Sequence, residues 1–135
     1  MMKIYLIPNL SKSAARKTAV SVIEQLVQLG AEILMDESIS DELKAPRVLW
    51  AREEQALADC DVIVTIGGDG TILHAARKAM EAGKPIMGIN RGRMGFLATA
   101  ESGEHEKLAR LVSGDWKIDK RTTLAVRTSG RSFFE

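Results

Sequence analysis

A glycine-rich loop with one carboxylate is the part of this sequence best suited to chemistry. Three glycines flank Asp69 in the run GGDGT at positions 67–71, directly after the apolar stretch 62–66. Glycines let successive backbone N–H groups converge on an anion, and a helix that begins there adds its positive dipole end. A carboxylate in such a site repels phosphate unless it binds a cation or accepts a proton. The loop therefore points to phosphoryl transfer, with a tight strand-to-helix turn as the purely structural alternative.

The loop matches neither of the two commoner phosphate-binding motifs. No stretch reads G-x-x-x-x-G-K-[ST], and Leu73 stands where a dinucleotide-binding fingerprint would place its third glycine. Walker-type and ordinary dinucleotide-binding interpretations are therefore weak.

A second candidate loop, NRGRMGFL at positions 90–97, follows the apolar run 85–89. Arg91 and Arg93 can bring positive charge to phosphates, and Phe96 offers a face for stacking on a base. Taken singly, each has a plainer interpretation, because arginine is usually solvated and phenylalanine usually belongs to the core. Open α/β sheets bind ligands at the carboxyl ends of their strands, so two such loops at successive strand ends together predict a ligand site.

These two segments together resemble the N-terminal domain of bacterial NAD kinases, over roughly residues 3–126. Diacylglycerol and sphingosine kinases share the first motif, and phosphofructokinases carry a related one, whereas the second motif discriminates. The resemblance implies transfer of the γ-phosphoryl group of ATP, or of polyphosphate in some members, to the 2′-hydroxyl of the adenosine ribose of NAD. It also implies Mg²⁺ or another divalent cation as cofactor.

The resemblance also assigns roles to residues. Asp69 would be the catalytic base that accepts the proton of the attacking hydroxyl, and binding of Mg²⁺ by the same carboxylate stays open. His74 lies in the first turn of the helix after the loop, where its ring can reach a phosphate or ribose; a half-exposed histidine without a ligand is the plainer alternative. The residues expected to bind nucleotide are Gly67, Gly68, Asp69, Gly70, Thr71, His74, Asn90, Gly92, Arg93, Gly95 and Phe96.

Composition limits the classes of protein to consider. The 135 residues suffice for one domain with a core, and 19 Lys plus Arg against 18 Asp plus Glu give a net charge of +1. This balance offers no field that would gather nucleic acid or an anionic membrane nonspecifically. The apolar start, residues 1–7, is too short for a signal peptide or a spanning helix, so we expect a cytoplasmic protein. The lone Cys60 predicts a packed thiol.

The apolar pattern alternates between short runs and helical spacing, which predicts an α/β fold with a three-layer, Rossmann-like parallel sheet. We expect helix 72–82 to bury the apolar residues of its sequence, including Leu73 and Met80. Trp50 is expected in or beside the core. Strands are predicted at 3–8, 31–35, 62–66 and 85–89, helices between Ser11 or Ser13 and Gly30, at 48–58, at 72–82 and around 108–113, and a loop at 36–47.

The pattern changes near residue 120. We predict an α/β nucleotide-binding domain over 1–120, and over 121–135 the start of a second domain as a hairpin that turns at Ser129-Gly130. The resemblance implies that this second domain is β-rich and completes the dinucleotide pocket. The chain would then be truncated and make no NADP by itself, and the full-length protein would be a homo-oligomer. The alternatives are a non-catalytic nucleotide-binding module, or a lipid or sugar kinase that shares only the GGDGT loop.

Overall fold

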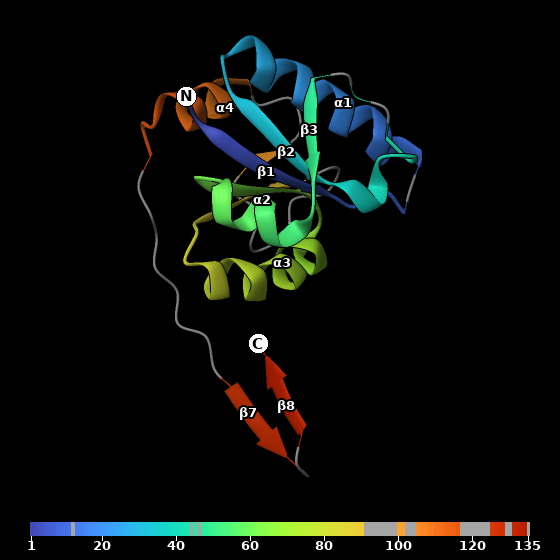
Figure 1. Cartoon of the computed structure of the whole chain (residues 1–135), viewed down its shortest axis with the longest axis vertical. Coiled ribbons are helices and arrows are strands. Elements are labelled where there is room, and N and C mark those ends of the chain that lie inside the picture. The colour runs from blue at the N-terminus through green and yellow to red at the C-terminus, as the bar shows by residue number, and fades with distance from the viewer. Residues whose placement is uncertain are drawn as a thin grey trace.

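The computed structural model describes residues 1–11, 13–43, 45, 47–90, 100–101, 105–116, 125–128 and 131–134. Six parallel strands form one sheet in the order β3-β2-β1-β4-β5-β6 (Figure 1). The strands are β1 (Lys3–Pro8), β2 (Glu32–Asp36), β3 (Val48–Ala51), β4 (Val62–Gly67), β5 (Ile86–Asn90) and β6 (Ala100–Glu101).

Helices cover both faces of this sheet, as the three-layer prediction requires. One face packs against α1 (Ser13–Gln28) and α4 (His105–Ser113), whose buried residues share a core cluster with those of the strands. The other face packs against α2 (Glu53–Asp59) and α3 (Asp69–Ala82) through a second, smaller cluster. Strand β4 runs through the centre and is buried along its whole length, which explains its unbroken apolar sequence.

Glycines lie at or just after the ends of α1, α3 and α4, where the sequence predicted these helices to end. Gly30, Gly83 and Gly114 have φ values of 93°, 68° and 83°. This left-handed conformation is strained for residues with a Cβ atom, so glycine is the residue that ends a helix in this way at little cost.

The prediction of one helix over residues 48–58 is wrong for the first half of this segment. Val48–Ala51 forms β3, which pairs in parallel with β2, and only Glu53–Asp59 is helical. The β-branched and aromatic residues at its start favour a strand, and the partner strand that decides the matter is distant in sequence. Trp50 is partly buried and packs against the main core, as predicted.

Helix α3 also differs from the prediction. It begins at Asp69, three residues before the predicted start, and buries Ile72, Ala75 and Ala79. Leu73 and Met80, both expected to be buried, are each 52% exposed. Two of the larger apolar residues of this helix therefore lie outside its buried stripe, which is formed by Ile72 and small alanines that fit the space above the sheet.

Near the C-terminus, β7 (Ala125–Thr128) and β8 (Arg131–Phe134) pair in antiparallel fashion as a separate two-stranded sheet (Figure 1). Antiparallel pairing is what the predicted hairpin requires, but its turn at Ser129-Gly130 lies outside the described residues, and the domain boundary near residue 120 stays a prediction. In the described part of the chain, no helix is long and apolar enough to cross a membrane.

The strand order places a topological switch point between β1 and β4. From β1 the chain moves outward through β2 and β3, and then crosses back to β4 and moves outward in the other direction. The loops after β1 and β4 consequently diverge, and in open α/β sheets the crevice between two such loops is the usual ligand site.

Candidate functional site

A pocket of about 550 Å³ lies at this switch point. It opens where β1 and β4 end, and the glycine-rich loop forms one side of it. The residues that line it are Ile7, Pro8, Asn9, Gly68, Gly70, Thr71 and His74. The predicted loop residues Gly68, Gly70 and Thr71 are therefore brought together with His74 around a single space.

Gly67 is glycine because the fold requires it. A Cβ atom added there would collide with Oγ1 of Thr71 and lie 3.0 Å from Cβ of Thr71 and 3.2 Å from Cβ of Asn9. The residue is buried at the end of β4. Its role is thus to let the start of α3 and the end of β1 approach each other closely.

Gly68 and Gly70 have no such reason to be glycine. A Cβ atom added to either would meet nothing within 4 Å, and neither residue has a left-handed φ. Both are exposed and both line the pocket. Added side chains at these positions would enter the space that a ligand would fill, so the two glycines keep that space open.

The start of α3 supplies the site with positive potential. Gly68 is the N-cap residue, with φ −106° and ψ −167°, and as a glycine it has no side chain that could cap the helix. The first N–H groups of a helix have no acceptor within the helix, and its N-terminus carries about half a positive charge. An anion in the pocket would accept hydrogen bonds from these N–H groups and would be attracted by the positive charge.

Asp69 stands between the two lining glycines, in the first turn of α3. It is half-buried and is not itself among the residues that line the pocket. The residue does not act as the N-cap, because Gly68 holds that position. The loop thus offers backbone donors on either side of a single carboxylate.

Asn9 is a lining residue that the sequence did not indicate. Its backbone N–H donates to the carbonyl of Ile66 at 2.8 Å, and its Oδ1 accepts from the N–H of Ser11 at 3.1 Å. These two bonds fix the chain at the point where it leaves β1. An asparagine after the first strand was a signal that could have been noted, but only the β1–β4 pairing places it beside the loop.

The second predicted loop lies mostly outside the described residues. Gly92, Arg93, Gly95 and Phe96 belong to that part, and their roles remain predictions. Asn90 ends β5, where its backbone is in register with Gly67 of β4. The second loop therefore leaves the sheet next to the strand that leads into the GGDGT loop.

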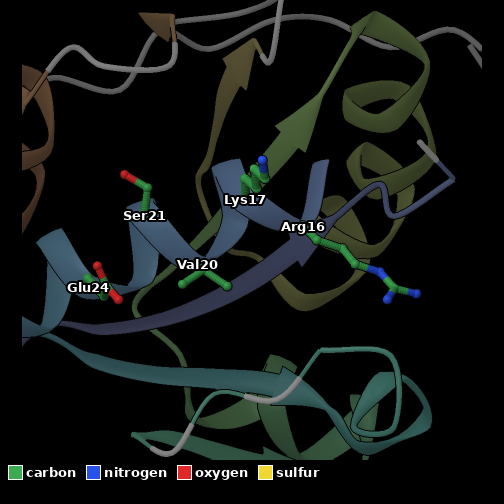
Figure 2. A pocket seen from close by; sticks show the side chains of 5 residues that line it. All are labelled: Arg16, Lys17, Val20, Ser21 and Glu24. Atoms are coloured by element: carbon green, nitrogen blue, oxygen red, sulfur yellow. The ribbon is translucent and has the colours of Figure 1, made fainter. Parts of the chain in front are cut away.

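Another hollow, of about 350 Å³, lies on the surface of α1 (Figure 2). Figure 2 shows its five lining side chains, all from this one helix: Arg16, Lys17, Val20, Ser21 and Glu24. It has neither a strand end nor a glycine-rich loop, and its charges are of both signs. The switch-point pocket is therefore the stronger candidate.

Comparison with known proteins gives the family of the chain. The family model described as the ATP-NAD kinase N-terminal domain matches residues 4–115. The chain belongs to the ATP-NAD kinase family. This membership removes the lipid or sugar kinase alternative, which rested on the GGDGT loop alone.

Relatives in this family cover most of the chain. The NAD kinase of Moorella thermoacetica is 36% identical over 125 residues, which is 92% of this chain and 40% of that protein. The NAD kinase of Methanopyrus kandleri is 38% identical over 117 residues, 83% of this chain and 41% of that protein. The chain thus spans about two fifths of the length of these relatives.

Solved structures share the fold. A yeast NADH kinase complexed with NADH superposes with a TM-score of 0.69 at 23% identity, covering 99% of this chain and 46% of that one. A conserved protein from Enterococcus faecalis V583 gives a TM-score of 0.56 at 13% identity, covering 86% of this chain and 99% of that one. At such identities the likeness shows the fold alone.

Proposed function

We propose that this chain is the nucleotide-binding half of an NAD kinase and that the switch-point pocket holds phosphate groups of its substrates. One observation carries the proposal: Gly68 and Gly70 keep space open in the pocket, although neither the backbone conformation nor the packing requires glycine there. Family membership adds the substrate class, with NAD as acceptor and ATP as donor. A cytoplasmic location and homo-oligomers of the full-length protein belong to the same proposal.

The proposed reaction needs a group that accepts one proton. The 2′-oxygen of the adenosine ribose of NAD attacks the γ-phosphorus of ATP, the bond from that phosphorus to its bridging oxygen breaks, and ADP leaves. We assign the hydroxyl proton to the carboxylate of Asp69, whose position between the lining glycines is suited to this role. The N–H groups at the start of α3 would stabilise charge on the phosphate oxygens.

The residues present are compatible with Mg²⁺. No group of three or more His, Cys, Asp or Glu residues that could hold a metal occurs among the described residues. Mg²⁺ in phosphoryl-transfer sites is commonly held by one or two carboxylates together with substrate phosphates, so Asp69 alone fits this pattern. When bound, the ion would neutralise phosphate charge.

A non-catalytic nucleotide-binding module is the second candidate, because the described residues contain the loop and the pocket but no second catalytic group. The two candidates differ in product. A catalytic protein forms NADP from NAD and ATP, whereas a module binds nucleotide without forming it.

The deciding experiment is an NADP-formation assay on the full-length protein with NAD, ATP and Mg²⁺. We expect Asp69→Asn to lower kcat by roughly 10²–10⁴-fold, the range typical of a lost general base, with little change in Tm. Asp59→Asn is the matched control. Asp59 is exposed at the end of α2, just before β4 begins, whereas the pocket lies at the opposite end of β4. A kcat for Asp69→Asn within about threefold of the parent value would refute the base assignment.

A further inference from the structure

A polar network joins three elements of the fold, one of which is the helix that contributes to the pocket. The hydroxyl of Tyr5 in β1 donates to Oε2 of Glu53 in α2 at 2.7 Å, and Nζ of Lys78 in α3 donates to the same oxygen at 2.9 Å. Tyr5 is 1% exposed, and the side chains of Lys78 and Glu53 are 28% and 30% exposed. Partial burial makes this ion pair stronger and more directional than one on the open surface.

The state of the Glu53 carboxyl agrees with this geometry. Burial by itself opposes ionisation, but the hydrogen bonds from Lys78 and Tyr5 and the charges of Lys78 and His74 outweigh it and lower the pKa of Glu53. Burial, followed by the bond to Glu53, raises the pKa of Tyr5. The network is therefore held as a carboxylate between an ammonium group and a neutral phenol.

Lys78 lies on the side of α3 that also reaches the pocket. Gly70, His74 and Lys78 are spaced four residues apart, so they follow one another along the same side of the helix. Gly70 and His74 line the pocket, and Lys78 lies about 6 Å further along the helix axis than His74. A rotation of α3 about its axis that moved Lys78 would carry both lining residues with it.

Packing holds α3 most firmly near its start. Its buried residues are Ile72, Ala75 and Ala79, so the buried face beyond the first turn is made of alanines, while Leu73 and Met80 are 52% exposed. Hydrogen bonds are directional, so the bond from Lys78 adds an orientation-dependent contact to the packing of this part of the helix. The Lys78–Glu53 ion pair joins α3 to α2, whereas the Arg77–Glu81 pair lies within α3.

We propose that Glu53 is a positioning residue for the pocket: by binding Lys78 and Tyr5 together, it sets the rotation of α3 and so directs His74 and the Gly70 backbone toward the ligand. The ligand-binding consequence rests on the proposed function, while the positioning itself can be measured without any ligand. Glu53 does not line the pocket and has no contact role in this proposal.

Two reporters allow the test in the unliganded full chain. They are the NMR signals of the His74 ring, from one of only two histidines in the sequence, and of the Gly70 backbone amide. Glu53→Gln keeps an acceptor for Tyr5 but removes the charge that holds Lys78. Glu81→Gln is the matched control on the same helix, because Glu81 pairs with Arg77 within α3 at 3.2 Å and both side chains are about two-thirds exposed.

We expect Glu53→Gln to shift the His74 ring and Gly70 amide signals and to weaken ATP binding roughly two- to fivefold, while Glu81→Gln leaves both unchanged. Lys78→Met distinguishes a change in the position of α3 from a direct effect of the lost charge on the NMR signals. It removes a positive charge instead of a negative one, so a positional effect moves the His74 and Gly70 signals in the same direction as Glu53→Gln, and a purely electrostatic effect moves them in the opposite direction.

Opposite shifts, or unchanged Gly70 and His74 signals in Glu53→Gln, would overturn the positioning role. If the unmodified chain bound no ATP, the proposed function would fail at that point, and the signals of the unliganded variants would still decide whether Glu53 positions α3.

Discussion

Alanine at two glycines of the same loop should change stability in opposite directions. At Gly67 the new methyl group would collide with the Thr71 hydroxyl and lie 3.0 Å from Cβ of Thr71, which is fixed to the helix backbone. Overpacking of this kind costs about 1–3 kcal/mol. At Gly70 the methyl group meets nothing within 4 Å, and the residue is helical, so alanine should stabilise the chain by about 0.5–1 kcal/mol.

The same two substitutions should affect ligand binding differently from stability. Gly70 lines the pocket, so its new methyl group takes space and screens backbone donors, and we expect ATP binding to weaken about tenfold, or about 1.4 kcal/mol. The more stable variant would thus be the poorer binder. This combination separates a glycine kept for a ligand from a glycine kept for the fold.

The measurements are urea unfolding and isothermal titration calorimetry with ATP on both variants and the parent chain. Gly30→Ala is a further control, since Gly30 has a φ of 93° and lies at the other end of the sheet from the pocket: it should lose stability and keep ATP binding. The reasoning is refuted if Gly70→Ala binds ATP as tightly as the parent, or if Gly67→Ala is as stable as the parent.

Three further predictions concern polar groups that are buried or partly buried. The hydroxyl of Thr65 is fully buried and has no hydrogen-bond partner within the described residues. Thr65→Val should therefore raise the free energy of unfolding, measured by urea titration, by about 1 kcal/mol, and a variant less stable than the parent would contradict the prediction. Because the pKa of Tyr5 is raised above 10.0 in the folded chain, the unfolded state releases this proton first, and stability should fall as pH rises past 10, a loss that Tyr5→Phe should lack. Because the pKa of Glu53 is lowered from 4.5 in the folded chain, its stabilising contribution is present above pH 4.5 and is lost as the pH falls further. The free energy of unfolding of the parent should therefore approach that of Glu53→Gln between pH 5 and 3. A difference between the two that does not change with pH would refute this prediction.

The sequence was a good guide where local pattern and fold agree. Strand β4 and the glycines that follow it were predicted because a buried central strand is apolar throughout and a glycine-rich turn is unmistakable at its end. The helix ends at Gly30 and Gly83 were predicted for the same reason, since a left-handed residue needs glycine. These features depend on residues that are neighbours in the chain.

The errors and omissions have a common physical cause, which is contact between residues far apart in sequence. Val48–Ala51 became a strand because β2 provides a partner for it. Leu73 is exposed because alanines face the sheet instead. Asn9 entered the site because β1 pairs with β4, which brings the first strand's end beside a loop almost sixty residues later.

The sequence by itself therefore determined the family and the fold class and indicated the loop that we propose as the site, because two glycine-rich motifs follow successive apolar strands. The tertiary structure alone decided which glycine serves the fold and which serves the pocket. That difference lies in what surrounds each Cα atom: crowded atoms of Thr71 and Asn9 at Gly67, and open space at Gly68 and Gly70. The glycines of this loop are the same type of residue in the sequence, and they differ only in the atoms that surround them in the folded chain.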